Sequence, residues 1–388
     1  MKKILVLVSC VSSMIALSVF NIVVFANIPT TEDLLIQSYT DNKYYHRVCW
    51  LASHNSFAYK DDSFSSMWLH PNQKKSIQEQ LLHSVRSFMV DLYYEDNNPS
   101  KSIILAHKND ITGGKNYVQK FSSPFLSTIK EWLNDPKHQN DIITVHLESY
   151  VQSYRKIIDT LDAIDADSKS GTSESNLTSY LFDLCEYNGG VAKEGKAKCD
   201  WLNEKQLETK QLRWPTLGEM RQKNKRLVIF SDQVEDVGYG IMHVSNTMET
   251  QYDISAITGY SNCEMRREGR ALKAPIFIMN HFYGWEAIPG LGYFYEATNE
   301  FNEMAKRAGI CALQEGQWPN FIAVDNVGSN GGKEQLIVLA VNEHSEKCCA
   351  VAQQKGWLVE IVVKDEDVMG SEGGMQGNLE KKVFHEEL

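Results

Sequence analysis

The chain has 388 residues and a formal net charge of −11, and 43% of its residues are hydrophobic. This length exceeds that of one ordinary small domain but suits a single α/β barrel with insertions. The excess of acidic residues argues against a protein that follows nucleic-acid backbones, because such proteins need clustered Lys and Arg. It also excludes binding to anionic lipid through the net charge of the protein.

The first segment has the features of an export signal. Lys2 and Lys3 precede an apolar run from Ile4 to Ala26, which ends with small residues of the kind that a signal peptidase reads. We therefore expect residues 1–26 to be a signal peptide cleaved near Ala26, and the mature protein to be secreted or extracytoplasmic. A retained membrane anchor is the alternative, because a bilayer is spanned by roughly 20 apolar residues.

Export would place the cysteines in an oxidising compartment. Of the eight cysteines, Cys10 lies in the signal, so an odd number remains and at least one thiol is free or paired between chains. We expect one bridge between Cys185 and Cys199 and another between Cys263 and Cys311. The sequence lacks the C-x-x-C spacing that is typical of structural zinc sites.

Short apolar runs that are typical of buried strands alternate with helical patterns along the chain. The expected strands are Trp50–Ser53, Phe88–Tyr93, Ile103–Ala106, Ile142–Leu147, Arg226–Phe230, Ile276–Met279 and Phe321–Val324. Helical patterns lie at Ser76–Ser84 and Pro124–Leu133. The alternation favours a parallel sheet, and the number of strands indicates a single-domain TIM-type (β/α) barrel.

We expect the barrel to occupy residues 27–350. Residues 165–210 are polar and are expected to form an inserted loop that carries Cys185 and Cys199. Residues 351–388 are expected to be a largely disordered C-terminal extension, because the end of the chain is rich in Gly, Glu and Asp.

A group that can titrate or bind a metal follows almost every expected strand. These groups are His54-Asn55, Asp91, His107, Glu148, Asp232, Asn280-His281 and Asp325. In a barrel the C-terminal strand ends converge on one mouth, where the active site lies. Two histidines there permit one to take a proton from a nucleophile while the other gives a proton to a leaving oxygen. A polar residue often caps the loop that follows a strand, and this would explain any one of these positions. It does not readily explain why all of them carry such a group.

Six motifs resemble, in the expected order, those of one known family. They are Trp50-Leu-Ala-Ser-His-Asn-Ser-Phe57, Gln80-Leu-Leu-His-Ser-Val-Arg-Ser-Phe-Met-Val-Asp-Leu92, Leu105-Ala-His107, Ile142-Ile-Thr-Val-His-Leu-Glu148, Arg226-Leu-Val-Ile-Phe230 and Trp318-Pro-Asn-Phe-Ile-Ala-Val-Asp325. Across about residues 45–330 the chain resembles the X-domain family of phosphatidylinositol-specific phospholipase C, most closely its secreted phospholipase C-like members. The resemblance implies a TIM-type barrel that cleaves a phosphodiester with a neighbouring hydroxyl of the substrate as nucleophile.

The resemblance also implies roles for individual residues. His54 and His107 match the two catalytic histidines of the family, and we expect His54 to be the base and His107 the acid. Asp325 matches an aspartate that holds the first histidine and fixes its tautomer. The implied reaction is attack of the inositol 2-hydroxyl on the phosphorus of a phosphatidylinositol-type lipid, with release of diacylglycerol.

The two branches of the family neutralise the phosphate charge differently, with an arginine or with a calcium ion. Asp91 stands where the metal-free enzymes carry the arginine, and with Asn55 and Glu148 it forms an all-oxygen set that suits Ca²⁺. Met89 stands where the calcium branch has a glutamate, so we expect weak binding, roughly 10⁻⁴ to 10⁻³ M. A metal-free site with a structural Asp91 is the alternative.

Two further features lie outside this set. Arg86 precedes its strand, and we expect it to bind carbonyls or a carboxylate at the lower face of the barrel rather than phosphate. The aromatic segment Phe282–Tyr295, which contains Trp285, follows the strand that ends at His281. It is expected either to form a rim at a lipid interface or to pack as a loop core.

The expected partners are a phospholipid or other phosphodiester substrate and, transiently, a membrane surface; we expect a monomer that binds no nucleic acid. Two alternative functions stay open. Glycerophosphodiester phosphodiesterases share the barrel, but their His-Arg-Gly step and Glu-x-Asp pair are replaced here by His54-Asn55-Ser56 and Met89-Val90-Asp91. The other alternative is a non-catalytic secreted barrel used as a binding module, which measured turnover would separate from an enzyme.

Overall fold

The computed structural model describes residues 31–59, 71–108, 115–164, 176–189, 213–251, 263, 265, 273–282, 300–329 and 331–343. The strands are β1 (Trp50–Ser53), β2 (Ser87–Tyr94), β3 (Ile103–Lys108), β4 (Lys115–Lys120), β5 (Ile143–Ser149), β6 (Leu227–Ser231), β7 (Ile241–His243), β8 (Thr247–Glu249), β9 (Ile276–His281) and β10 (Phe321–Val324). The helices are α1 (Thr31–Ser38), α2 (Ile77–Leu82), α3 (Phe125–Asn134), α4 (Tyr154–Ala163), α5 (Leu184–Tyr187), α7 (Leu217–Gln222), α9 (Phe301–Glu315) and α10 (Lys333–Glu343).

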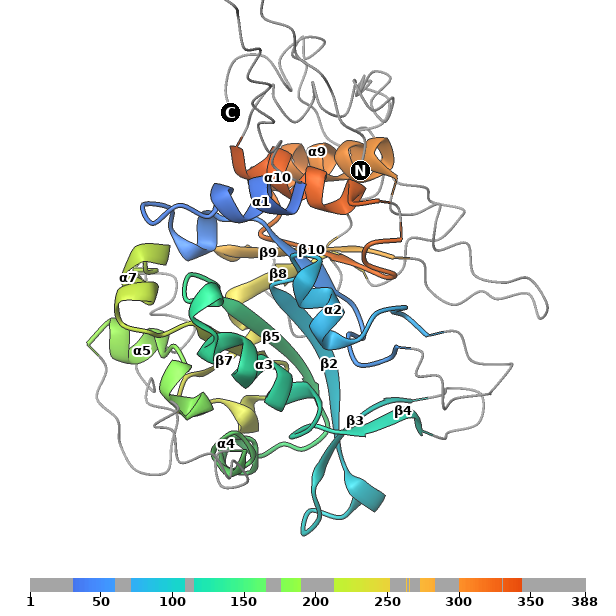
Figure 1. The fold of residues 1–388 in the computed structure, drawn as a ribbon, viewed down its shortest axis with the longest axis vertical. Helices are drawn as coiled ribbons and strands as arrows, with labels where there is room; N and C mark the ends of the chain where they lie inside the picture. The colour runs from blue at the N-terminus through green and yellow to red at the C-terminus, as the bar shows by residue number, and fades with distance from the viewer. Residues whose placement is uncertain are drawn as a thin grey trace, which may run out of the picture.

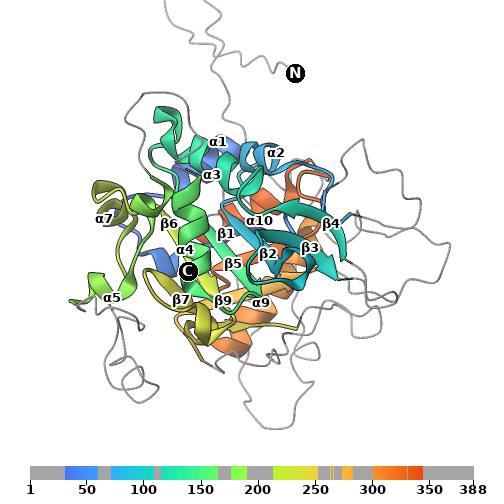
Figure 2. The same ribbon diagram turned by 90° about the horizontal axis from the view of Figure 1, so that it is seen from below.

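Eight strands form a curled parallel sheet in the order β7-β6-β5-β2-β1-β10-β9-β8. Its two ends, β7 and β8, follow one another in the chain and are joined by the short 3₁₀ turn Val244–Asn246. Figure 2 shows the strands at the centre with helices around them. The predicted α/β barrel architecture is therefore confirmed, as a sheet that curls around its own core.

Helix α3 covers the sheet with the apolar face that the sequence pattern predicted. Phe125 of α3 packs edge-on against Phe88 of β2, with ring centroids 5.9 Å apart. The side chains of Leu126, Ile129 and Leu133 are buried along the same helix. At the other side of the sheet, α1 and α9 both pack against α10 (Figure 1). Among the described residues, no helix has the length and apolar character to cross a membrane.

The strand at Ile103–Ala106 differs from the prediction in its direction. β3 pairs antiparallel with β2 through Leu92 and Leu105, and it pairs antiparallel with β4, so the two form a hairpin beside the main sheet (Figure 1). An apolar run indicates that a strand is buried but not whether it runs parallel or antiparallel to its neighbour. The sequence pattern therefore could not distinguish a hairpin strand from a parallel barrel strand.

The expected loop at residues 165–210 is structured in part. Residues 177–180 form a 3₁₀ turn and α5 follows, because Leu177, Tyr180 and Leu184 are buried. The signal peptide at residues 1–26, the extension at residues 351–388 and the rest of this loop lie outside the described residues.

The cysteine predictions have different outcomes. Cys263 and Cys311 are disulfide-bonded, as predicted, which ties the chain before β9 to α9. Cys185 is also disulfide-bonded, and Cys199 lies outside the described residues, so that pairing stays a prediction. Cys49 is a free and buried thiol, and burial raises its pKa.

Arg86 has the structural role that we predicted. Its guanidinium donates to the carbonyl oxygens of Leu81 (2.8 Å) and Val85 (2.9 Å) and forms an ion pair of 3.0 Å with Asp141. The guanidinium carbon also lies 5.2 Å from the centroid of the Trp132 ring. Arg86 precedes β2 and Asp141 precedes β5, so this buried pair lies at the end of the barrel opposite the C-terminal strand ends.

Candidate active site

His54 and Asp325 meet at the C-terminal strand ends, which we call the mouth. Ser53 and Val324 are register partners in β1 and β10. His54 and Asp325 directly follow them, so the two residues lie next to each other where the strands end. The Nδ1 atom of His54 lies 3.0 Å from Oδ1 of Asp325, whose side chain is only 1% exposed. A carboxylate at Nδ1 keeps the proton on that nitrogen and makes Nε2 the basic one.

An asparagine in the left-handed region follows each of these two residues. Asn55 has a φ of 43° and Asn326 a φ of 52°. Asparagine tolerates this conformation better than most residues, so the chain turns sharply directly after His54 and after Asp325. The two sharp turns end the strands at the level of the mouth.

Two neighbours, Asn72 and Phe282, contact this pair. The Nδ2 atom of Asn72 donates to Oδ1 (3.3 Å) and Oδ2 (3.2 Å) of Asp325, and its Oδ1 accepts from Nδ2 of Asn55 at 3.3 Å. The ring of Phe282, directly after β9, stacks on His54 with centroids 3.7 Å apart and planes at 2°. Phe282 opens the aromatic segment noted above, whereas Asn72 belongs to no recognisable motif.

Asp91 and Glu148 lie side by side on neighbouring strands. They are register partners in β2 and β5, so their side chains leave the same face of the sheet, and both are half-buried. The hydroxyl of Tyr150 donates to Oε1 of Glu148 at 2.8 Å, and its ring stacks on Tyr93. Burial, followed by the charge of Glu148, raises the pKa of Tyr150, so its hydroxyl keeps the proton that it donates.

His107 reaches the site from the β3–β4 hairpin and not from a barrel strand. β3 runs antiparallel to β2, so the chain of β3 passes Tyr94 first and then continues toward the level of Asp91. The His107 side chain is half-buried. The second predicted histidine therefore lies on an element that flanks the mouth.

Two other polar groups at strand ends stabilise neighbouring loops and strands. Oδ1 of Asp232 accepts a hydrogen bond from the backbone N–H of Ser149 at 2.8 Å. Nδ2 of Asn280 donates to Oε1 of Glu249 at 2.9 Å and to the carbonyl oxygen of Thr250 at 3.0 Å. The capping interpretation thus describes these two positions well.

The donor set proposed for calcium consists of two carboxylates and one amide. Among the described residues, no group of three or more His, Cys, Asp and Glu side chains is arranged to hold a metal ion. The backbone N–H of Ser56 donates to the carbonyl oxygen of Met89 at 3.0 Å, which holds the Asn55 segment alongside the strand that carries Asp91. Carboxylate and amide oxygens are the ligands that Ca²⁺ prefers, so the chemistry of this set fits a hard cation.

Comparison with known proteins agrees with the predicted resemblance. The family model PI-PLC X 1 matches residues 178–338. A PI-PLC X domain-containing protein of Arabidopsis thaliana is 25% identical over 310 residues, which cover 74% of this chain and 60% of that protein. The predicted resemblance to the PI-PLC X domain family is confirmed.

Other relatives are matched over different lengths. An uncharacterised protein of Mycobacterium tuberculosis is 30% identical over 125 residues, which cover 30% of this chain and only a quarter (25%) of that protein. Phosphatidylinositol-specific phospholipase C from Listeria monocytogenes is 13% identical with a TM-score of 0.48, and the alignment covers 81% of this chain and 100% of that one. The range matched by the PI-PLC X model contains Asp325, whereas His54, Asp91, His107 and Glu148 precede it.

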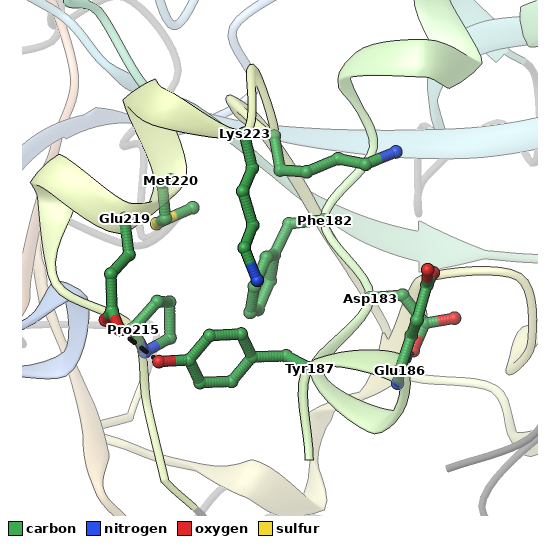
Figure 3. Close-up of a pocket in the computed structure, with 9 residues that line it drawn as sticks. Phe182, Asp183, Glu186, Tyr187, Pro215, Glu219, Met220 and Lys223 are labelled. Atoms are coloured by element: carbon green, nitrogen blue, oxygen red, sulfur yellow. Dashed lines mark hydrogen bonds between the residues drawn. The ribbon is translucent and has the colours of Figure 1, made fainter. Parts of the chain in front are cut away.

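Two hollows in the described part of the chain lie away from the mouth. One of about 170 Å³ lies beside α5 and α7, where Tyr187 donates to Glu219 at 2.8 Å and Lys223 lies over the Tyr187 ring (Figure 3). The other, of about 820 Å³, is lined by residues such as Pro275 and Asn320 that precede β9 and β10. It therefore lies at the end of the barrel opposite His54.

Proposed function

We propose that this protein is a phosphodiesterase that cleaves a phosphatidylinositol-type lipid at the barrel mouth. The observation that best supports the proposal is the His54–Asp325 pair, held at 3.0 Å at the ends of two adjacent strands. Asp91 and Glu148 are register partners on the neighbouring strands β2 and β5, and β2 pairs with the strand that His54 follows. This is the arrangement expected for a base with a nearby site for a cation.

In the proposed reaction, Nε2 of His54 takes the proton of the inositol 2-hydroxyl. The 2-oxygen then forms a bond to phosphorus while the bond from phosphorus to the glycerol oxygen breaks. His107 gives a proton to the departing oxygen, so the products are diacylglycerol and an inositol 1,2-cyclic phosphate. Asp325 stabilises the imidazolium that forms on His54.

Asn55, Asp91 and Glu148 are the residues that would hold Ca²⁺. The ion would supply positive charge beside the phosphate oxygens. Tyr150 orients Glu148 through their hydrogen bond, and partners of this kind usually affect the affinity of a metal site.

We also propose transient contact with a membrane surface beside the mouth. Tyr150, Val234 and Tyr239 are 51%, 67% and 42% exposed, and they lie in the segments that follow β5 and β6. Large exposed apolar and aromatic side chains of this kind suit a lipid interface. The predicted aromatic rim around Trp285 lies outside the described residues.

Export as a secreted monomer is part of the proposal, and it rests on the sequence of residues 1–26. Expression of the full chain, followed by recovery of a monomer that begins near residue 27 from the medium or periplasm, would support it. Retention of the intact N-terminus in a membrane fraction would contradict it.

A substrate panel tests the proposed function against its alternatives. Purified protein would be incubated with phosphatidylinositol, phosphatidylcholine and glycerophosphoinositol, with His54→Ala as the inactive control. The proposal predicts release of diacylglycerol from phosphatidylinositol. Exclusive cleavage of glycerophosphoinositol would indicate the glycerophosphodiester phosphodiesterase alternative, and no turnover of any diester would indicate a binding module.

A further inference from the structure

Asn72 connects the two halves of the candidate site. We propose that it is a positioning residue that couples the His54–Asp325 pair to Asn55, the amide ligand of the proposed cation. This inference deepens the proposed function and rests on it. Its basis is one side chain with two ends, whose nitrogen binds Asp325 and whose oxygen binds Asn55.

The orientation of the Asn72 amide follows from its partners. Its NH₂ group lies 3.3 Å and 3.2 Å from the two carboxylate oxygens of Asp325. With the amide reversed, a carbonyl oxygen would face a carboxylate and two NH₂ groups would face each other at Asn55. Only the orientation described gives each group a complementary partner.

Hydrogen bonds from the neighbouring backbone hold Asn72 against both strand ends. The backbone N–H of Asn326 donates to the carbonyl oxygen of Asn72 at 2.8 Å. The fully buried Gln73 donates to the carbonyl oxygens of His54 (2.8 Å) and Val324 (3.1 Å). Asn72 is therefore attached to the ends of β1 and β10, and its side chain has little freedom to leave Asp325.

The consequence for the base is a fixed tautomer. The Asn72 amide binds both oxygens of Asp325, which keeps the carboxylate rotated so that Oδ1 faces Nδ1 of His54. Without this amide the carboxylate can turn, and the imidazole can place its proton on Nε2, the nitrogen that must accept a proton. An effect on kcat rather than on KM follows.

The consequence for the cation is a fixed ligand. Because Nδ2 of Asn55 donates to Asn72, the Oδ1 atom of Asn55 points away from Asn72 and stays available as an acceptor. Loss of Asn72 would release the Asn55 amide, and a released ligand weakens a cation site, typically by about 10- to 100-fold. Substitution of Asn72 should therefore change both the tautomer of His54 and the affinity for Ca²⁺.

The test compares Asn72→Ala with the unmodified protein. Two measurements are independent of turnover: the ¹⁵N shifts of the His54 ring, assigned with His54→Gln, and Ca²⁺ binding by calorimetry. We expect a mixed tautomer, weaker Ca²⁺ binding, and a kcat that falls about 10- to 100-fold with KM changed less than about twofold. Asp325→Ala should alter the tautomer and weaken Ca²⁺ binding less than Asn72→Ala does, because the Asn72 side chain that binds Asn55 is still present.

A matched control and a conservative variant complete the design. Asn188→Ala removes an amide that binds the carbonyl oxygens of Leu184 and Arg213, away from the mouth, and should change none of these readouts. Asn72→Ser keeps one donor and should be intermediate, which also provides a test if the alanine variant does not fold.

A change in only one of the two readouts, or in neither, overturns the coupling. If the unmodified protein shows no turnover, the proposed function fails while the tautomer and Ca²⁺ measurements still test the inference.

Discussion

Asp91 and Glu148 are direct partners in the parallel register of β2 and β5. Like charges on directly opposite residues of neighbouring strands repel each other, and a cation bound between them would remove that repulsion. The hydrogen bond from Tyr150 satisfies one oxygen of Glu148 but brings no positive charge. The pair is thus the part of the site where a cation would stabilise the fold and serve the chemistry together.

Removal of calcium should abolish turnover. Excess chelator should stop the reaction, millimolar Ca²⁺ should restore it, and Mg²⁺ should serve poorly because it requires tighter octahedral geometry. Asp91→Asn should raise the Ca²⁺ concentration that gives half-maximal activity, and Asp91→Arg should recover partial metal-independent turnover. Initial rates in buffered calcium measure all of these effects, and full activity in excess chelator would show that the site works without a metal.

Asp325→Asn should keep the shape of the site and lose most of its activity. The amide can no longer hold the Nδ1 proton of His54 in the same way, and an analogous change in a catalytic triad costs about 10⁴ in kcat. Asp41→Asn, which removes a surface carboxylate paired with Arg221, is the matched control and should leave kcat unchanged. A kcat for Asp325→Asn within tenfold of the unmodified value would contradict the assigned role.

His107→Ala should affect substrates according to their leaving group. Loss of a general acid costs about 10² to 10⁴ in rate when the departing oxygen needs a proton. A substrate that releases 4-nitrophenol needs none, so its turnover should be spared, whereas His54→Ala should remove both activities. Equal losses on the two substrates of the His107 variant would exclude it as the acid.

Arg86→Met should destabilise the barrel. The substitution removes the arginine from the buried Asp141, which keeps its contacts with Nε1 of Trp132 (2.9 Å) and Nδ1 of His138 (3.3 Å). Loss of one partner of a buried ion pair typically costs about 3–5 kcal/mol. The exposed pair of Lys101 and Asp96 offers a comparison, because solvent screens this pair and Lys101→Met should leave the free energy of unfolding nearly unchanged. Denaturant unfolding measures both variants, and similar values for the two would refute the structural importance of Arg86.

The sequence predicted strands where at least four mostly apolar residues follow one another. The expected bounds of β1 and β10 match the structure, because their residues are all buried and polar residues follow at the mouth. β7 and β8 were missed since each has three residues, too few for a recognisable pattern. β4 was missed because Lys115–Lys120 is largely polar.

The candidate site was predictable where a residue directly follows a strand. His54, Asp91, Glu148 and Asp325 lie on or directly after barrel strands, so periodicity alone assigned them to one mouth. Asn72 lies in the polar stretch that precedes α2, where no spacing relates it to Asp325, which is 253 positions away. A contact of this kind depends on tertiary folding, and local sequence does not reveal it.

The chemical identity of the first product tests the proposed reaction most directly. Phosphatidylinositol vesicles would be incubated with the protein in millimolar Ca²⁺ and followed by ³¹P NMR, with His54→Ala as control. The proposed reaction should give a cyclic phosphodiester signal that appears together with diacylglycerol and is absent with the variant. Phosphatidylinositol that stays intact, or a first product that is an acyclic inositol phosphate, would contradict it.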